Sequence, residues 1–389
     1  MYKIKTLNSI SRVGLDILDP ERYEVGEFDA PDAILVRSAK MHDAVFNPEL
    51  LCIARAGAGT NNIPTERCAE SGVVVFNTPG ANSEAVKELV LGAMLLSSRD
   101  LIGGIKWVQT IADKGDEVAS LVEAGKNKFV GPELYGKTLG VIGLGAIGAK
   151  IANDAIALGM NVYGYDPYLS VDAAWRLSSK VTHAKELGTL LRNSDYITIH
   201  VPYMDSTHHY ISGDQIAQMR DGARLINLAR AELVDDDAVV AALASGKLSR
   251  YVTDFPNGKT AGADGVIAIP HLGASTPESE DNCAYMAVAQ VIDYIENGNI
   301  VNSVNMPTAF LPRTGGDMRV CVYHRNVPDM ISKIAGALSA RGLNIENMLN
   351  AGGKGGNYAY TLIDVRHVPE GVADALAQLK DVIKVRVLA

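Results

Sequence analysis

The sequence predicts an α/β protein that contains a doubly wound parallel sheet of the Rossmann type and a small C-terminal domain of βαββαβ order. Short apolar runs rich in Val, Ile and Tyr alternate with longer helical patterns up to about residue 300, as in a parallel sheet covered by helices. A glycine-rich turn follows one of these apolar runs. The segment 301–318, with two prolines and two adjacent glycines, then interrupts the pattern and precedes the C-terminal domain.

The length and composition are those of an ordinary globular protein. The 389 residues suffice for two or three domains at roughly 100–200 residues each. A net charge of −9 and the lack of a basic cluster disfavour nucleic acid as a partner. No apolar run reaches the roughly 18–20 residues that span a bilayer, and the polar first residues lack the apolar core of a signal peptide. We therefore expect a cytoplasmic protein that binds neither nucleic acid nor membrane.

The cysteines carry no metal or disulfide pattern. Cys52, Cys68, Cys283 and Cys321 are scattered without CxxC spacing. This distribution predicts reduced, buried thiols and neither a disulfide framework nor a zinc site. No metal is expected.

Four apolar segments are expected to form fully buried strands of the parallel sheet. They are "LGVIGL" (139–144), "MNVYGYD" (160–166), "DYITIHVP" (195–202) and "ARLINLA" (223–229). Residues 83–98 have the pattern of a helix that is apolar on nearly every face, so it should be buried between domains or between subunits. The expected assembly is a homodimer or homotetramer.

The C-terminal segment 317–389 has the pattern of a ferredoxin-like domain, with residues 304–316 as its linker. Strands are expected at "RVCVYH", around "NIENMLNA", at "NYAYTLIDV" and at "VIKVRVL". Helices are expected at "PDMISKIAGALSARG" and "PEGVADALAQLK". This order, βαββαβ, is that of a small α/β sandwich.

The glycine-rich turn in "GVIGLGAIG" is predicted to bind a dinucleotide. Gly143 permits the tight turn, Gly145 lets a pyrophosphate approach the backbone, and Gly148 lets the following helix lie close on the strand. The amides of Ala146 and Ile147 then face the phosphates at the positive end of that helix.

The acid at the end of the next strand indicates which dinucleotide binds. Asp166 stands 18 residues past Gly148, where a carboxylate accepts both ribose hydroxyls and repels a 2′-phosphate. No Arg or Lys follows in "DPYLS", so NAD is favoured over NADP. A plain helix cap beside a surface aspartate is the alternative.

A series of motifs, in its order and spacing, resembles the D-isomer-specific 2-hydroxyacid dehydrogenases over nearly the whole chain. The motifs are "VRSAKMHD", "ARAGAGTNNIP", "FNTPGANSEAVKEL", "GVIGLGAIG", "HVPYMDST", "INLARAELVDDDAV", "PHLGAST" and the terminal βαββαβ unit, which resembles an ACT domain. The resemblance implies a flavodoxin-like substrate-binding lobe of residues 1–98 and 283–303, an NAD-binding lobe of residues 99–282, and a substrate in the cleft.

The resemblance also implies a catalytic pair. Arg230, in "NLARAELVD", matches the arginine that binds the substrate carboxylate and polarises its carbonyl, and a planar guanidinium suits that task. His271, in "PHLGAST", matches the acid/base, since histidine titrates near working pH. Taken alone, the two residues would be a surface arginine and a loop histidine.

Further cofactor contacts are implied by the same resemblance. Asp254 matches the aspartate that holds the carboxamide, although the alignment is uncertain by one residue and Thr253 is an alternative. The other matching positions are His200, Val201, Pro202 and Thr207 around adenine and ribose, Leu228 and Ala229 near the nicotinamide, and Gly273. Packing at strand ends is the alternative role for these residues.

The substrate-binding positions implied by the resemblance are Arg37, Ser38, Gly57, Ala58 and Asn82, with Gly57 and Ala58 acting through backbone amides. Two lysines, Lys40 and Lys128, could add positive charge for a phosphate. A solvated surface role is the alternative for both lysines.

Two departures from the family pattern concern the catalytic pair. Ala231 and Glu232 follow Arg230, where the family often has glycine, and this changes only a turn. The carboxylate that orients the histidine is absent, because Gly258 stands just past "DFPN". Asp264, a more distant acid or water is left to hold His271, so we expect a functional but less strongly tuned histidine.

The reaction that the resemblance implies is NAD-linked oxidation of 3-phosphoglycerate at C2, the entry to serine synthesis. His324, Asn326 and Asn344 match positions through which related dehydrogenases bind serine, so serine is the expected effector across a pair of C-terminal domains. A purely structural C-terminal domain is the alternative. For the whole chain, the alternatives are a dehydrogenase for glycerate, lactate or phosphoerythronate, an NAD-sensing regulator, and an inactive NAD-binding protein.

Overall fold

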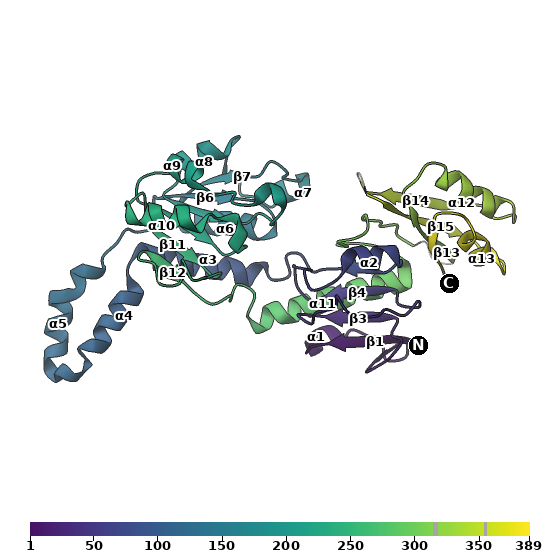
Figure 1. Cartoon of the computed structure of the whole chain (residues 1–389), viewed down its shortest axis with the longest axis horizontal. Helices are drawn as coiled ribbons and strands as arrows, with labels where there is room; N and C mark the ends of the chain where they lie inside the picture. Colours follow the sequence, from purple (N-terminus) through teal and green to yellow (C-terminus); the bar gives the residue numbers. More distant parts are fainter. Residues whose placement is uncertain (314–317, 354–355) are drawn as a thin grey trace. The chain divides into compact units, whose positions relative to one another are not determined.

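This computed structural model describes residues 1–313, 318–353 and 356–389. These residues form three β-sheets with helices around them (Figure 1). The residues sort into two compact units, Met1–Asn82 with Pro277–Ala389 and Ser83–Thr276. The end of the predicted linker, 314–316, and residue 317 lie outside the described residues. The chain passes between the units after Asn82 and after Thr276, and a helix begins at each passage.

The N-terminal sheet of the first unit is parallel and has the strand order β2-β1-β3-β4-β5, which is the flavodoxin-like order. Its strands are β1 (Tyr2–Leu7), β2 (Tyr23–Val25), β3 (Ala33–Val36), β4 (Cys52–Arg55) and β5 (Val74–Phe76), and the helices around it are α1 (Arg12–Leu15), α2 (Thr65–Glu70) and α11 (Pro277–Asn297). The long helix α11 packs on α1 and β4. The flavodoxin-like fold predicted for this lobe is thereby confirmed.

The sheet of the second unit is also parallel, with the order β12-β11-β10-β9-β6-β7-β8. Its strands are β6 (Thr138–Ile142), β7 (Asn161–Tyr165), β8 (Thr182–His183), β9 (Tyr196–Ile199), β10 (Ala223–Asn227), β11 (Leu248–Thr253) and β12 (Val266–Ala268). The chain reverses its direction of travel across the sheet between β6 and β9, which is the switch point where Rossmann-type folds bind ligands. All four predicted strands are present, and each overlaps its predicted segment.

Helices cover the second sheet. They are α3 (Ser83–Ser98), α6 (Ala146–Ala157), α7 (Val171–Ala174), α8 (Leu187–Asn193), α9 (Gly213–Gln218) and α10 (Asp236–Ala244), with the 3-10 turns η3 (Asp205–Thr207) and η4 (Ala231–Leu233). Helix α3 packs on α6, and its Val90 and Met94 are buried in the core of this unit. The sequence predicts residues 83–98 in the substrate-binding lobe, whereas the structure places them in the second unit because their apolar side chains complete that core.

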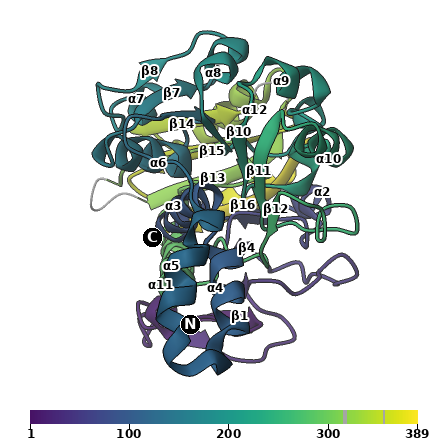
Figure 2. The same cartoon turned by 90° about the vertical axis from the view of Figure 1, so that its left-hand side faces the viewer.

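Two helices of the second unit form an arm outside the sheet. Figures 1 and 2 show α4 (Leu101–Thr110) and α5 (Val118–Gly125) side by side, joined by the 3-10 turn η1 (Ala112–Glu117) and followed by η2 (Lys126–Phe129). No residue of α4 is buried, and Leu101, Ile105 and Val108 are exposed apolar side chains.

The C-terminal sheet is antiparallel and has the order β14-β15-β13-β16. Its elements are β13 (Met318–Arg325), α12 (Met330–Ser339), β14 (Asn347–Gly352), β15 (Tyr358–Val365), α13 (Val372–Ala377) and β16 (Val382–Leu388). This is the predicted βαββαβ order with the strand arrangement of ferredoxin-like folds.

Both faces of the C-terminal sheet are covered. One face, which includes Val320 and Ile363, packs on α12 and α13. The other face, which includes Cys321, Tyr323 and Tyr360, shares a continuous core with α11 and the N-terminal sheet. The sequence predicts a separate domain behind a linker, but alternation of large side chains on both faces of the strands joins this sheet to the first unit instead.

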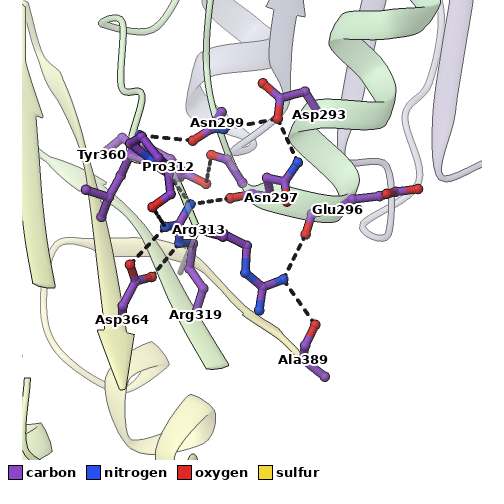
Figure 3. Close-up of polar contacts among 12 residues, drawn as sticks. Asp293, Glu296, Asn297, Asn299, Pro312, Arg313, Arg319, Tyr360, Asp364 and Ala389 are labelled. Carbon is purple, nitrogen blue, oxygen red and sulfur yellow. Dashed lines mark hydrogen bonds and ion pairs between the residues drawn. The ribbon is translucent and has the colours of Figure 1, made fainter. Parts of the chain in front are cut away.

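Arg319, a buried arginine of the C-terminal sheet, forms an ion pair within the sheet and also binds the end of α11 (Figure 3). Arg319 Nε and Nη2 donate to Asp364 Oδ1 and Oδ2 at 2.6 and 2.9 Å, and both side chains are at most 2% exposed. Arg319 Nη1 donates to the carbonyl oxygens of Asn297 and Leu311, at 2.8 Å each. The guanidinium therefore binds the sheet, the last residue of α11 and the connecting segment at once.

The cysteines have the environment expected of inert thiols. All four are free and buried. Burial raises the pKa of Cys52 to about 12 and that of Cys68 to about 11, so neither thiol ionises at neutral pH. In the described ranges, no helix is both long and apolar enough to cross a membrane.

Candidate active site

The glycine turn after β6 has the geometry of a phosphate cradle. Gly143 has a φ of +89°, and a Cβ there would lie 2.7 Å from the carbonyl oxygen of His200, so only glycine fits. A Cβ on Gly148 would overlap the carbonyl oxygen of Gly143, which is how close α6 lies to the strand. A Cβ on Gly145, the residue before α6, would meet nothing within 4 Å.

These contacts fit the group that the turn is predicted to hold. The open face at Gly145 leaves room for a pyrophosphate, and the first amides of α6, those of Ala146 and Ile147, lie at the positive end of a twelve-residue helix. The turn also stands beside the switch point of the sheet. The residues present therefore suit a dinucleotide.

Asp166, directly after β7, is held in place by backbone amides. Its Oδ2 accepts from the amide of Leu144 and its Oδ1 from the amide of Tyr168, both at 2.9 Å. The first bond joins the acid to the glycine turn. Each carboxylate oxygen keeps a lone pair for a ribose hydroxyl.

The predicted adenine–ribose segment follows β9. His200 Nε2 lies 2.8 Å from Thr198 Oγ1, and burial lowers the pKa of His200 to about 3, so this imidazole is neutral. The Thr207 hydroxyl donates to the carbonyl oxygen of Pro202 at 2.9 Å and accepts from the amide of Met204 at 2.8 Å. The hydroxyl of Thr207 therefore stabilises the loop that contains Val201 and Pro202.

The turn that carries Arg230 is fixed by a residue that the sequence motifs do not single out. Asn227, fully buried at the end of β10, donates through Nδ2 to the carbonyl oxygen of Arg230 at 2.8 Å and accepts through Oδ1 from the amide of Ala229 at 3.2 Å. Leu228 is buried between them, and the Arg230 side chain is exposed. The exposed Arg230 guanidinium donates through Nη1 to the carbonyl oxygen of Ala229 at 2.7 Å, so the same turn orients it.

His271 follows β12 and lies against Phe255. The two ring centroids are 4.6 Å apart with an interplanar angle of 49°, and His271 is exposed. Asp254, the neighbour of Phe255, is only 1% exposed, and neither of its carboxylate oxygens has a hydrogen-bond partner among the described residues. Its Oδ2 lies 3.4 Å from where a Cβ on Gly273 would stand, so the His271 loop covers this carboxylate.

The electrostatics of Asp254 follow from that burial. Desolvation raises the pKa of its carboxyl group, and the positive charges of His271 and Arg230 oppose the shift, together with the backbone amide of Gly273. Gly258 and Asp264, the two positions considered for an orienting acid, are both exposed. The buried carboxylate nearest to the catalytic pair is thus that of Asp254.

The first unit holds a polar pocket at the carboxyl ends of β3 and β4. It is lined by Ser38, Lys40, His42, Arg55, Asn61 and Asn62. Two predicted substrate residues, Ser38 and Lys40, are among them, whereas His42, Arg55 and the two asparagines were missed. Arg55 stands inside the quoted motif "ARAGAGTNNIP" as the only charge at the end of its strand, and that position was the available signal.

Gly57 and Arg37 flank this pocket. Gly57 has a φ of +147°, and a Cβ there would overlap Arg55 Nη1, so glycine makes room for the guanidinium. Arg37 Nη2 donates to Glu280 Oε1 of α11 at 2.6 Å, with both side chains about 40% exposed, at 40% and 43%. The Ala58 carbonyl oxygen accepts from Asn77 Nδ2 at 2.6 Å.

The remaining substrate candidates lie apart from the pocket lining. Asn82 is the last residue of the first unit, immediately before α3. Lys128 lies in η2 of the arm in the second unit and is exposed. Neither residue lines the pocket, so their substrate roles stay predictions.

The effector candidates lie in the C-terminal part of the first unit. His324 is 2% exposed, and its Nε2 lies 2.9 Å from Thr361 Oγ1 and 3.3 Å from Asn350 Oδ1. Asn326 and Asn344 are exposed; Asn326 donates to the carbonyl oxygen of Gly356 at 3.2 Å. The sequence does not single out Asn350 and Thr361, because cross-strand partners of His324 appear only once the register of β13, β15 and β14 is known.

The metal chemistry of the site can be addressed for the described ranges only. Across residues 1–313, 318–353 and 356–389, no group of three or more His, Cys, Asp or Glu side chains has the placement needed to hold a metal ion.

The arrangement as a whole defines a class of protein. A dinucleotide cradle, with an arginine and a histidine at the carboxyl ends of the same parallel sheet, is typical of nicotinamide-dependent dehydrogenases. Residues 91–273 match the model of the D-isomer specific 2-hydroxyacid dehydrogenase NAD binding domain. D-3-phosphoglycerate dehydrogenase of Haemophilus influenzae is 32% identical over 366 residues, 90% of this chain and 84% of that protein. The chain belongs to the D-isomer-specific 2-hydroxyacid dehydrogenase family.

Two further comparisons agree with this assignment. D-3-phosphoglycerate dehydrogenase of Methanocaldococcus jannaschii is 37% identical over 288 residues, 71% of this chain, and the chain spans about half, 52%, of its length. The crystal structure of NAD+-bound 3-phosphoglycerate dehydrogenase from Entamoeba histolytica shares the fold, with a TM-score of 0.60 and 24% identity over 80% of this chain and 99% of that one. The predicted family and its NAD binding domain are confirmed.

Proposed function

We propose that this protein oxidises D-3-phosphoglycerate at C2 with NAD to give 3-phosphohydroxypyruvate, the first step of serine synthesis. The observation that carries the proposal is the pocket of the first unit. Its lining includes the permanent cations Lys40 and Arg55, His42 and three neutral polar side chains, and no carboxylate. A phosphate dianion suits such a lining, because lysine and arginine side chains bind phosphate oxygens through charge-assisted hydrogen bonds.

The reacting end of the substrate would engage residues of the second unit. Arg230 would bind the carboxylate and the developing carbonyl through its paired donors. His271 would accept the proton of the C2 hydroxyl as the C2–H bond breaks. Bound NAD supplies the acceptor for the hydride that leaves C2. The glycine turn and Asp166 would hold the cofactor.

The test is an assay in the reducing direction. Oxidation of NADH is followed with 3-phosphohydroxypyruvate and with a panel of 2-oxo acids that includes hydroxypyruvate, pyruvate and the 2-oxo derivative of phosphoerythronate. The highest kcat/KM is expected for 3-phosphohydroxypyruvate, and His271→Ala should lower it by about 10²- to 10⁴-fold. A preference for an unphosphorylated acid would contradict the proposal.

The other functions give different results in the same assay. A glycerate or lactate dehydrogenase would prefer the unphosphorylated acid, and a phosphoerythronate dehydrogenase would prefer the longer phosphorylated one. An NAD-sensing regulator or an inactive enzyme would bind NADH and oxidise it with no member of the panel. Lys40→Ala and Arg55→Ala connect the result to the pocket, since both should raise KM for the phosphorylated acid far more than they lower kcat.

A second proposal concerns the C-terminal sheet. We propose that it is an ACT domain that binds serine through His324, Asn326 and Asn344, across a pair of such domains from two copies of the chain. The support is the ferredoxin-like strand order and the position of His324 and Asn326 at one end of β13. Serine should slow turnover and release heat on binding, and Asn344→Ala should abolish both effects. No heat and no change of rate would leave the sheet a purely structural role.

An oligomer is part of the same proposal. The arm of α4 and α5 buries no residue of α4 within the chain and exposes Leu101, Ile105 and Val108, which is unusual for a helix that serves a monomer. Sedimentation of the purified protein should give a dimer or a tetramer. A monomer at micromolar concentration would contradict this assembly.

A further inference from the structure

The carboxylate that serves His271 can be sought among the strand ends of the second sheet. Strands β10, β11 and β12 are neighbours and run parallel, so their carboxyl ends lie in a row. Arg230 follows the first of them, Asp254 the second and His271 the third. The middle position of that row is therefore held by an acid, between the two residues of the catalytic pair.

The side chain of Asp254 is buried, and no described side chain pairs with it. It is 1% exposed, and neither carboxylate oxygen makes a hydrogen bond to a described residue. Burying a carboxylate in this way costs free energy, and folded proteins retain such groups mainly where they have a task. The loop of His271 covers it, since Oδ2 lies 3.4 Å from a Cβ placed on Gly273 and the ring of Phe255 packs on His271 at 4.6 Å.

From this geometry we propose that Asp254 is the positioning acid of His271, in place of the carboxylate that is missing at Gly258. The described residues show no direct ion pair between the two side chains, so the carboxylate acts on the imidazole through its charge and as an acceptor when the ring turns inward. The charged groups that bear on it are His271 and Arg230. Protonation of His271 then gains a buried counter-charge.

The alternative for Asp254 is the one taken from the family resemblance, contact with the carboxamide of NAD. The two roles differ in what they need. A carboxamide contact requires an acceptor atom, which asparagine also has, whereas stabilisation of an imidazolium requires the negative charge. Thr253, adjacent to Asp254 in the sequence and also buried, remains available for the carboxamide.

The decisive measurement needs neither cofactor nor substrate. The imidazole C2 protons of the eight histidines are titrated by NMR in the full-length, cofactor-free protein, and His271 is assigned by the signal lost in His271→Gln. In Asp254→Asn, the midpoint of the His271 titration should move to lower pH by about one unit. Asp264→Asn, which neutralises an exposed acid in the same segment, should not move it. An unmoved His271 in Asp254→Asn would overturn the proposal.

Kinetics and binding separate the two roles. The positioning role predicts that Asp254→Asn lowers kcat about tenfold or more, shifts the acidic limb of the pH–rate profile, and changes the dissociation constant of NAD less than about twofold. The carboxamide role predicts weaker NAD binding and an unchanged profile, which would contradict the proposal. If the asparagine variant does not fold, Asp254→Ser removes the same charge with less volume.

This inference rests on the proposed acid/base role of His271 and does not depend on which acid is oxidised. If the assay of 2-oxo acids shows a different substrate while the His271 titration shifts as expected, only the substrate assignment fails. If 3-phosphohydroxypyruvate is preferred and the titration does not shift, only the role of Asp254 fails.

Discussion

Two buried carboxylates of this protein differ in their hydrogen bonding. Asp364, in the C-terminal sheet, is 2% exposed and receives two hydrogen bonds from Arg319. Asp254, at the edge of the dinucleotide-binding sheet, is equally buried and receives none from the described residues. A charge that only holds structure is fully paired in the fold. A charge left without a partner is available to a reacting group, at a cost in stability.

The largest loss of stability is expected at the ion pair of Arg319 and Asp364. Arg319→Met would leave the Asp364 carboxylate buried without a counter-charge, so we expect the free energy of unfolding to fall by about 3–5 kcal/mol, measured by urea denaturation. The double variant Arg319→Met with Asp364→Leu should recover most of that loss, because both charges are gone. A loss below about 1 kcal/mol in the single variant would show that the buried pair contributes little to the stability of the fold.

At Asp254 we expect a substitution to raise the free energy of unfolding instead of lowering it. Asp254→Asn removes a buried charge that no described side chain pairs with, so the free energy of unfolding should rise by about 1 kcal/mol, the lower end of the cost of such a group. The gain comes with the loss of kcat described above. A destabilised asparagine variant would show that the carboxylate is satisfied in the folded protein and would remove the contrast with Asp364.

The pH dependence of this effect has a defined direction. Because burial raises the pKa of Asp254 above that of an aspartate in the unfolded chain, the folded state holds this proton at pH values where the unfolded chain has released it. The wild type therefore loses stability as the pH rises from about 4 through the raised pKa, and the asparagine variant lacks that loss. Urea midpoints should diverge upward of about pH 4 and coincide below it.

A smaller effect, on KM, is expected at the partly exposed carboxylate of Glu280. Glu280 pairs with Arg37 at 2.6 Å, and both side chains are partly exposed. If Arg37 binds a substrate oxygen, Glu280 competes for the same guanidinium. Glu280→Gln should then lower KM for the substrate up to about fivefold with kcat nearly unchanged, within the range of surface pairs. Asp281→Asn, at the neighbouring position of α11, is the control, and an equal change in KM there would show a general charge effect.

The smallest effect is expected at Gly258. A Cβ there would meet nothing within 4 Å, so Gly258→Glu can be introduced without a clash. If Asp254 already serves His271, this glutamate should change kcat less than about twofold. A large gain, together with a shifted pH–rate profile, would show that His271 lacks an acid in the wild type.

The sequence predicts the elements better than their grouping. The strands that precede Gly143 and Arg230 are recognisable because a parallel sheet buried on both faces produces uninterrupted apolar runs. The position of α3 is not, since the apolar side chains of residues 83–98 suit either lobe and only the packing against α6 decides. The core that the C-terminal sheet shares with α11 could not be predicted either, because alternation along a strand does not say what covers each face.

The candidate site shows the same limit. Gly143, Gly145 and Gly148 are readable from spacing, because the turn imposes a steric requirement on each. Asn227 is not, since a buried asparagine acquires its role only from the partners that the fold brings to it. For Asp254 the sequence offers a position in a motif, and its burial without a side-chain partner among the described residues becomes visible only in three dimensions.

The shared core has a consequence for how this chain can be taken apart. Tyr323 and Tyr360 of the C-terminal sheet donate to the carbonyl oxygens of Ala69 in α2 and Gly298 after α11, at 2.7 and 2.9 Å. Removing the chain after residue 304 would expose the apolar side chains of α11 that the C-terminal sheet covers. The separated C-terminal sheet would in turn expose the face that carries Tyr323 and Tyr360. Gene fusions that graft this segment onto another dehydrogenase must therefore carry α11 along, and a truncated catalytic half will need solubilising substitutions on the exposed face of that helix.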